Sequence, residues 1–227
     1  MVFHSFYLIL LVPAILLSLY AQFKVQSTFK KYLTVNNSKG LTGAMVARTI
    51  LDRQGMPDVE IEQVDGYLSD HYDPQTRTVR LSPEVYNGTS VSSLGVAAHE
   101  TGHAIQHNIR YLPLSIRSIL VPIANISSWT AIPLIIMGLI IQQIGLIIIG
   151  IIIFSLAVAF QLITLPVEIN ASKRALAILS DGFLTPDELK HTKKVLSAAS
   201  MTYVAAGTVA FAEFLKSILQ FFNSRND

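Results

Sequence analysis

The apolar residues of this chain are gathered into three long blocks that carry no Asp, Glu, Lys or Arg. These blocks are residues 2–23, 118–167 and 195–212. Fifty helical residues at about 1.5 Å each extend roughly 75 Å, whereas the hydrocarbon core of a bilayer is about 30 Å thick, so the middle block must cross it twice. Its most polar point, at 142–145, predicts a turn between spans at 119–141 and 144–166. Pro122 and Pro133 lie inside the first of these spans and predict a kink.

Between the first two blocks, polar and apolar residues alternate at shorter spacing. Leu41 to Gln54 has helical periodicity, and Val59 to Val64 and Thr76 to Leu81 alternate as short strands do. We therefore expect a mainly α, polytopic membrane protein with about four transmembrane helices and a small cytoplasmic α+β unit. The expected segments are a transmembrane anchor at 1–23, a cytoplasmic α+β region at 24–117, a two-helix transmembrane hairpin at 118–167, a cytoplasmic segment at 168–194, and a fourth transmembrane helix with a short tail at 195–227.

Charge predicts the orientation of these segments. Lys and Arg side chains cluster after the first block, before the second, and between the second and the third, whereas only Lys216 and Arg225 follow the third. The positive-inside rule then places both chain ends outside and the α+β region in the cytoplasm of a multi-pass plasma-membrane protein. With 14% charged residues, the chain is more apolar than soluble domains, in which about a quarter are charged. Zero cysteines agree with a reducing compartment, and a net charge of +2 spread along membrane flanks argues against a nucleic-acid partner.

Residues 99–103 read His-Glu-Thr-Gly-His, in a helix-compatible stretch that follows a plausible N-cap at Ser90. On a helix, His99 and His103 are four residues apart, so both imidazoles project from one face and can bind one Zn²⁺. Glu100 then points toward a metal-bound water. We predict His99 and His103 as zinc ligands and Glu100 as the catalytic base. The structural alternative is a pair of hydrogen-bonded helix histidines.

A catalytic zinc site needs one more protein ligand. His107 is excluded as a partner of His99, because eight residues span about 12 Å along a helix axis and ligands of one zinc ion lie within roughly 4 Å of each other. Glu168 is favoured, because two membrane crossings return the chain to the side on which His99 lies. The alternative for Glu168 is a solvated carboxylate beside the membrane. Asp181 and Glu188 are weaker candidates, since Glu188 is expected to serve in a helix capping box.

Three further residues are candidates for supporting roles. His71 and Tyr72 lie just before the second predicted strand and could orient a ligand or stabilise the oxyanion, although a turn rich in Asp and Pro is the commoner explanation. Tyr203 could donate to the oxyanion from the last apolar block, where close packing against other helices is the alternative. A strand beside the motif helix would also bind an extended peptide by edge pairing.

Six segments of the chain follow a pattern known from one family. They are Val46-Ala47-Arg48 with Ile50-Leu51, Asp70-His71-Tyr72-Asp73-Pro74, Thr78-Val79-Arg80-Leu81-Ser82, Ala97-Ala98-His99-Glu100 with Gly102-His103-Ala104-Ile105-Gln106, Leu165-Pro166-Val167-Glu168, and Thr202-Tyr203-Val204-Ala205-Ala206. Together they resemble the membrane zinc metallopeptidases typified by bacterial YugP, over nearly the whole chain. One departure is Asn170, at which the family pattern implies Asp, so Asn170 is a further candidate for a supporting role but does not supply a carboxylate there.

Residues 168–171 are also similar to the Glu-x-x-Ala-Asp element of HtpX-like and CAAX prenyl membrane proteases, although Ser172 replaces the Asp. In those proteases the Glu is the third zinc ligand. This resemblance implies a metal site at the cytoplasmic membrane surface and supports Glu168 as a ligand.

The predicted function is that of a membrane-embedded, zinc-dependent endopeptidase whose substrate is a peptide or a membrane protein. Its partners would be that substrate and the lipid bilayer, and the sequence leaves the oligomeric state open. The alternative is a non-catalytic membrane scaffold or assembly partner with a structural metal, in which His71 or Asp181 would supply a fourth ligand. A metal transporter is disfavoured, because the two spans of the middle block contain no ionisable residue.

Overall fold

The computed structural model describes residues 2–224. Met1 and residues 225–227, at the ends of the expected anchor and tail, lie outside the described residues. In chain order the elements are α1 (Val2–Leu33), α2 (Gly43–Arg53), β1 (Glu60–Gln63), β2 (His71–Asp73), β3 (Thr78–Leu81), α3 (Pro83–Tyr86), α4 (Val91–Asn108), α5 (Leu112–Ile140), α6 (Ile144–Ser180) and α7 (Pro186–Ser224). They form two compact units, one made of 2–21, 112–166 and 202–224, the other of 22–111 and 167–201.

Several helices are long and apolar enough to cross a membrane. Among the described residues these are Ile9–Leu33, Ile144–Ser180 and Pro186–Phe222, with a fourth where Leu112–Ser127 and Trp129–Ile140 form one bent span. The two parts of this span meet at 40°, in a helix that contains Pro122 and Pro133. A mainly helical membrane protein is therefore confirmed, with three or four candidate spans. Helices α1 and α7 both continue beyond the apolar blocks into charged sequence, so the expected limits at residues 23 and 195 are not helix ends.

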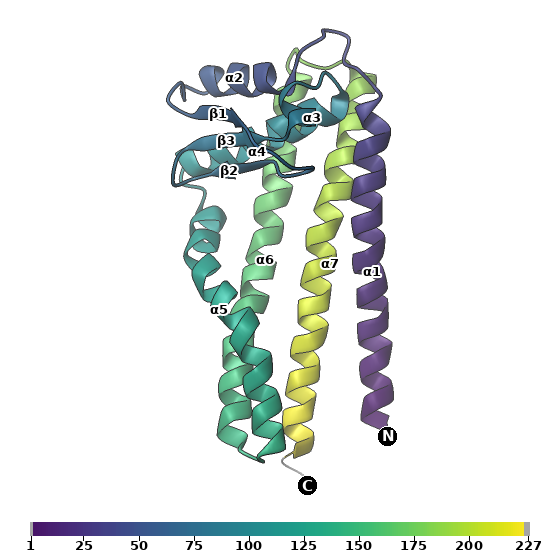
Figure 1. Ribbon diagram of the computed structural model, residues 1–227, viewed down its shortest axis with the longest axis vertical. Coiled ribbons are helices and arrows are strands. Elements are labelled where there is room, and N and C mark those ends of the chain that lie inside the picture. Colours follow the sequence, from purple (N-terminus) through teal and green to yellow (C-terminus); the bar gives the residue numbers. More distant parts are fainter. Residues whose placement is uncertain (1, 225–227) are drawn as a thin grey trace. The chain divides into compact units, whose positions relative to one another are not determined.

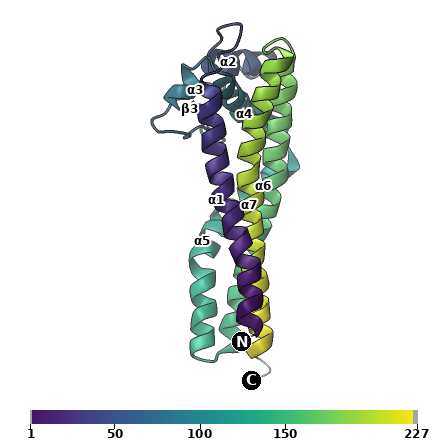
Figure 2. The same ribbon diagram turned by 90° about the vertical axis from the view of Figure 1, so that its right-hand side faces the viewer.

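In the first unit, α5 and the first half of α6 run as an antiparallel pair (Figures 1 and 2). The turn between them falls where the sequence predicts it, and Gln142 adopts a φ of 56° there. A Cβ on Gly138 would lie 2.7 Å from the Ile147 side chain, and one on Gly150 would lie 3.0 Å from the Ala131 carbonyl oxygen. These glycines let the two helices approach closely, as small residues do between helices in lipid.

The second unit contains a three-stranded sheet in the order β1-β3-β2. β1 and β3 pair in parallel, and β2 pairs antiparallel with β3, Tyr72 standing opposite Val79. The two strands expected from alternation are present. The sequence did not predict the third strand, since His71–Asp73 lies where a turn rich in Asp and Pro was the commoner explanation. Arg80 of β3 links the two outer strands through ion pairs to Glu62 of β1 at 3.0 Å and to Asp73 of β2 at 2.8 Å.

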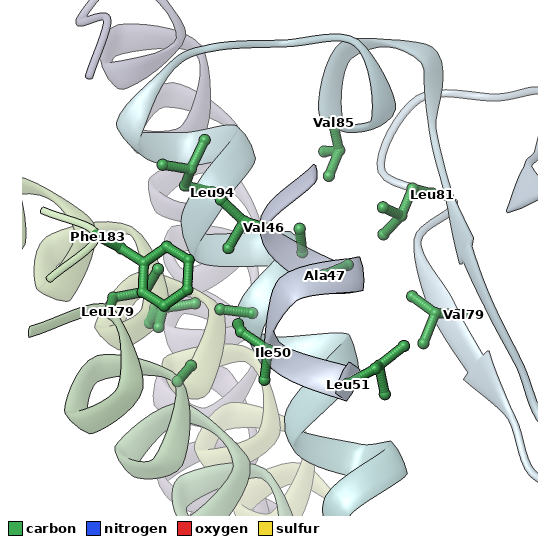
Figure 3. Packing of buried hydrophobic residues seen from close by; sticks show 14 of the residues in the cluster. Val46, Ala47, Ile50, Leu51, Val79, Leu81, Val85, Leu94, Leu179 and Phe183 are labelled. Carbon is green, nitrogen blue, oxygen red and sulfur yellow. The ribbon is translucent and has the colours of Figure 1, made fainter. Parts of the chain in front are cut away.

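The core of the second unit lies where α2 packs against β3, α3 and α4 (Figure 3). One face of α2 supplies Val46, Ala47, Ile50 and Leu51, all fully buried. This spacing produces the single apolar face that a surface helix packs against a core. Leu179, near the end of α6, joins the same cluster. The core therefore joins the end of α6, which belongs to the second unit, to the helix that carries the histidine motif.

Candidate metal centre

Helix α4 carries the histidine motif, and most of its side chains are buried. The hydroxyl oxygen of Ser90 accepts a hydrogen bond from the Ser93 backbone N–H at 3.0 Å, which confirms the expected N-cap. His99 and His103 lie one turn apart, with ring centroids separated by 4.8 Å and ring planes at 86°. The helix therefore brings both imidazoles to one place, as their spacing predicts.

Helix α6 brings Glu168 to this pair of histidines. The Glu168 carboxylate is 2% exposed, and its Oε2 lies 3.1 Å from His99 Nε2 and 3.4 Å from His103 Nε2. Gly102 of α4 makes this approach possible, because a Cβ there would lie only 3.0 Å from the carbonyl oxygen of Ala171 on α6. A larger residue at 102 would push the two helices apart.

The three side chains fit a zinc ion in spacing and in chemistry. Two ligand atoms that each lie about 2.1 Å from zinc in tetrahedral coordination are about 3.4 Å apart, close to the two distances measured from Glu168 Oε2. Imidazole nitrogen and carboxylate oxygen are both ordinary zinc ligands. Within the described part of the chain, the group contains His99, His103 and Glu168 and no fourth His, Cys, Asp or Glu. Three protein ligands are typical of a catalytic site rather than a closed structural one.

Gln106 fixes which nitrogen of His103 carries hydrogen. Its side-chain N–H groups donate to the Val167 carbonyl oxygen at 2.9 Å and to Asn170 Oδ1 at 3.0 Å. Since a carbonyl oxygen only accepts, the amide orientation is set, and Oε1 faces His103 Nδ1 at 3.0 Å. That amide oxygen also only accepts, so Nδ1 must be the donor. In the neutral ring, Nε2 then presents its lone pair to the Glu168 oxygen, and these two acceptors require a proton or a metal ion between them.

The remaining contacts of the centre orient its other parts. His99 Nδ1 lies 3.1 Å from the hydroxyl of Ser172, which can accept its hydrogen and leave Nε2 free for a metal. Asn170 Oδ1 also accepts from Arg174 Nε at 2.8 Å, so a chain of hydrogen bonds runs from Arg174 through Asn170 to the amide of Gln106. The amide oxygen of Asn170 thus accepts two hydrogen bonds where the family pattern implies a carboxylate, and its role in the site stays a prediction.

Negative charge near His103 favours a cation at the centre. Burial lowers the pKa of His103, but the hydrogen bond to Glu168 and the charge of Glu100 outweigh it, so the pKa is raised on balance. Glu100 is itself 9% exposed. Asp70 lies close enough to Glu100 for the two charges to interact. The pKa of Asp70 is raised to about 6, because burial and the charge of Glu100 together outweigh the hydrogen bonds from Ser82 that lower it.

Tyr72 lies on β2 and contacts α4 rather than the histidine pair. Its hydroxyl is 2.8 Å from His107 Nδ1, so the two residues link β2 to the end of α4. This contact gives His107 a partner, consistent with its exclusion as a ligand. His71 is exposed, and its Nδ1 lies 2.8 Å from the Ser69 carbonyl oxygen. His71 does not belong to the group of converging ligand atoms.

The weaker ligand candidates also lie outside that group. Asp181 is exposed in the turn after α6, where its carbonyl oxygen accepts from Arg53 at 3.5 Å. Glu188 accepts from the Thr185 backbone N–H at 2.7 Å and its own N–H donates to the Thr185 hydroxyl at 3.4 Å, which confirms the expected capping box. Tyr203 belongs to the first unit, and its part in the site stays a prediction.

Comparison with known proteins agrees with a zinc site in this chain. A family model described as "Putative neutral zinc metallopeptidase" matches residues 7–222. The chain belongs to this family. It is also 49% identical over 222 residues to "Putative membrane protease YugP" of Bacillus subtilis (strain 168), with 97% of this chain and 99% of the relative covered. No solved structure shows significant similarity to the chain. The resemblance inferred from the sequence is thereby confirmed. The chain is a membrane zinc metallopeptidase.

Three residues around this candidate centre were not singled out from the sequence as possible members of it. Gln106 follows His103 by three residues on one helix, so its position on the same face could have revealed it. Ser172 was noted only as a replacement for Asp, yet its hydroxyl contacts His99. Asp70 approaches Glu100 from the loop before β2, and no spacing rule on a single element could have placed it there.

Proposed function

We propose that the chain is a membrane-embedded, zinc-dependent endopeptidase in which His99, His103 and Glu168 hold the metal and Glu100 acts as general base. The observation that carries the proposal is the convergence of three acceptor atoms, one of them fixed by Gln106 in the tautomer that binds a metal. Zinc held by such a set supplies a Lewis acid and a water of lowered pKa. The carboxylate of Glu100 takes the proton of the attacking water and passes it to the leaving amine.

The substrate main chain is proposed to lie along β2. This strand pairs with β3 on one edge and packs beside α4, to which Tyr72 and His107 link it. Its other edge has no strand partner within the described residues, so an extended peptide can add there through main-chain hydrogen bonds. Because main-chain groups are common to all peptides, this mode favours an endopeptidase with a peptide or membrane-protein substrate.

The test of this mechanism separates catalysis from metal binding. In the purified protein, Glu100→Gln should lower peptide hydrolysis by at least about a hundredfold, the scale of general-base catalysis, while zinc stays near one ion per chain. Glu60→Gln is the matched control, because Glu60 is an exposed carboxylate on β1 outside the metal group. Comparative proteomics of membranes with wild type or Glu100→Gln would identify uncut substrates. Full activity of Glu100→Gln would reject this residue as the base.

The active site is proposed to face the cytoplasm in a multi-pass plasma-membrane protein, because Lys and Arg side chains cluster on that side. The absence of cysteine allows a direct test. A cysteine at Gln75, an exposed position between β2 and β3, should react with a membrane-impermeant maleimide only after the cells are opened. Labelling of intact cells would reverse the orientation without affecting the proposed chemistry.

A further inference from the structure

A second concentration of charge lies between α1 and α7 within the second unit. A pocket of about 920 Å³ is lined by Lys24, Thr28, Lys31, Tyr32, Asp187, Lys190, His191, Lys193, Lys194, Ser197, Ala198 and Met201. Both views show the second-unit parts of α1 and α7 side by side (Figures 1 and 2). The pocket contains five lysines and one carboxylate, and none of its lining residues belongs to the metal centre. Its volume is within the range of ligand sites, roughly 300–1,000 Å³.

The positive charge of this pocket is largely uncompensated. Asp187 pairs with Lys190 at 2.9 Å. Within the described part of the chain, the other four lysines of the pocket have no ion pair with a carboxylate. Ammonium groups that share a pocket repel one another, and an anion between them removes that repulsion. The pocket therefore favours an anionic ligand.

One wall of the pocket is built by an ordered aromatic contact. Tyr32 of α1 stacks on His191 of α7, with ring centroids 4.9 Å apart and planes at 26°. Lys31 Nζ lies 5.6 Å from the centroid of the Tyr32 ring. These contacts join the two helices within the pocket, so its lysines project from a fixed pair of helices.

The position of the pocket along both helices indicates which anion it takes. Lys24 is the first charged residue after the apolar block of α1, and Lys194 is the last before the apolar block of α7. Ala198 and Met201 line the pocket toward the apolar side. We propose that the pocket binds the phosphate-bearing headgroup of an anionic phospholipid, with lysines at the phosphate and the acyl chains passing Ala198 and Met201. A free phosphate ion would use the lysines alone and would leave the apolar end without a contact.

The experiment measures retention of lipid by the purified full-length protein in detergent. Native mass spectrometry would follow binding of dioleoylphosphatidylglycerol against an equal amount of dioleoylphosphatidylcholine. Wild type should retain the anionic lipid preferentially. Lys193→Gln with Lys194→Gln should weaken its binding by about 30-fold, the effect expected from removing two lysines that contact an anionic lipid.

The matched control carries the same change in charge outside the pocket. Lys30→Gln with Lys173→Gln removes two exposed lysines that do not line it, and should leave lipid binding within about threefold of wild type. Equal loss in both double variants would show general attraction to basic protein and would overturn the site. Equal retention of the two lipids would also overturn it. Displacement of the lipid by millimolar inorganic phosphate would assign the pocket to the free ion and reject the lipid.

Discussion

Replacement of Gln106 tests whether this residue positions a zinc ligand or only fills the core. Gln106 is fully buried, and its amide makes three hydrogen bonds, to His103, Val167 and Asn170. Gln106→Leu keeps most of the volume and removes all three. The Nδ1–H of His103 then has no acceptor at this position, whereas Asn170 Oδ1 still accepts from Arg174.

The magnitudes follow from these contacts. One buried donor left without a partner costs about 1–3 kcal/mol, and loss of the two other hydrogen bonds brings the expected destabilisation to about 2–4 kcal/mol. Loss of the group that orients a metal-binding histidine typically lowers metal affinity by about 10- to 100-fold. We therefore expect Gln106→Leu to lose both stability and zinc affinity.

Gln106→Glu separates the two effects. A glutamate keeps an acceptor for His103 Nδ1–H but loses the N–H groups that donate to Val167 and Asn170. Stability should fall by at least about 1–3 kcal/mol, because the second carboxylate oxygen then faces the Val167 and Asn170 oxygens without a hydrogen between them, while zinc affinity should stay within about threefold of wild type, because the histidine keeps its tautomer. Thermal unfolding in detergent measures the first quantity, and competition with a chromogenic chelator measures the second.

Ile50→Ala is the control for instability alone. Ile50 is fully buried in the core around α2, away from the three ligand atoms, and its truncation should cost about 2–5 kcal/mol without changing zinc affinity in the folded protein. If Gln106→Glu loses as much zinc affinity as Gln106→Leu, the positioning role is wrong. If Ile50→Ala loses it too, the assay reports stability rather than the orientation of His103.

Two further predictions concern the surroundings of the centre. The folded pKa of Asp70, about 6, is higher than its unfolded value. The stability that protonated Asp70 contributes is therefore fully present below about pH 4 and is lost as pH rises through 6. Asp70→Asn should therefore gain about 1 kcal/mol over wild type between pH 5 and pH 7, and a constant difference in unfolding free energy would contradict this. Gly102→Ala should destabilise by about 1–3 kcal/mol and weaken zinc binding, because its Cβ meets the Ala171 carbonyl oxygen at 3.0 Å. Gly207→Ala, with no atom within 4 Å of its Cβ, should not destabilise the protein, and equal melting curves for both alanine variants would refute the close-approach argument.

Sequence reasoning succeeded where one periodicity decided the outcome. The spacing of His99 and His103 fixes their common face on a helix, and the length of the charge-free block requires a hairpin that returns Glu168 to the same side. The ends of α1 and α7 were harder to predict from the sequence, because hydropathy marks where the apolar sequence ends rather than where the helix ends. Charged residues such as Lys30 and Lys193 are good helix formers, so both helices continue through them.

The sheet was only partly predictable, for a different reason. Alternation identified the strands at Glu60–Gln63 and Thr78–Leu81 but carries no information about which strands pair, and these two pair in parallel. The segment His71–Asp73 is too short to show a period, and Asp73 followed by Pro74 is typical of a turn. Its extended conformation depends on pairing with β3, a contact between segments that the local sequence does not specify.

The support of the metal centre could not be predicted from the same rules, because it arises only when α4 and α6 meet. Gln106 bridges the helices by donating to Val167 while accepting from His103, so one amide both joins the backbones and fixes the ligand tautomer. Three acceptor atoms are thereby held within 4.8 Å of one another. Without a positive charge between them these three atoms repel one another, whereas each of them is attracted to a cation bound between them. If His99, His103 and Glu168 hold zinc as proposed, its binding is coupled to the packing of α4 on α6, and any change that separates these helices should weaken both together.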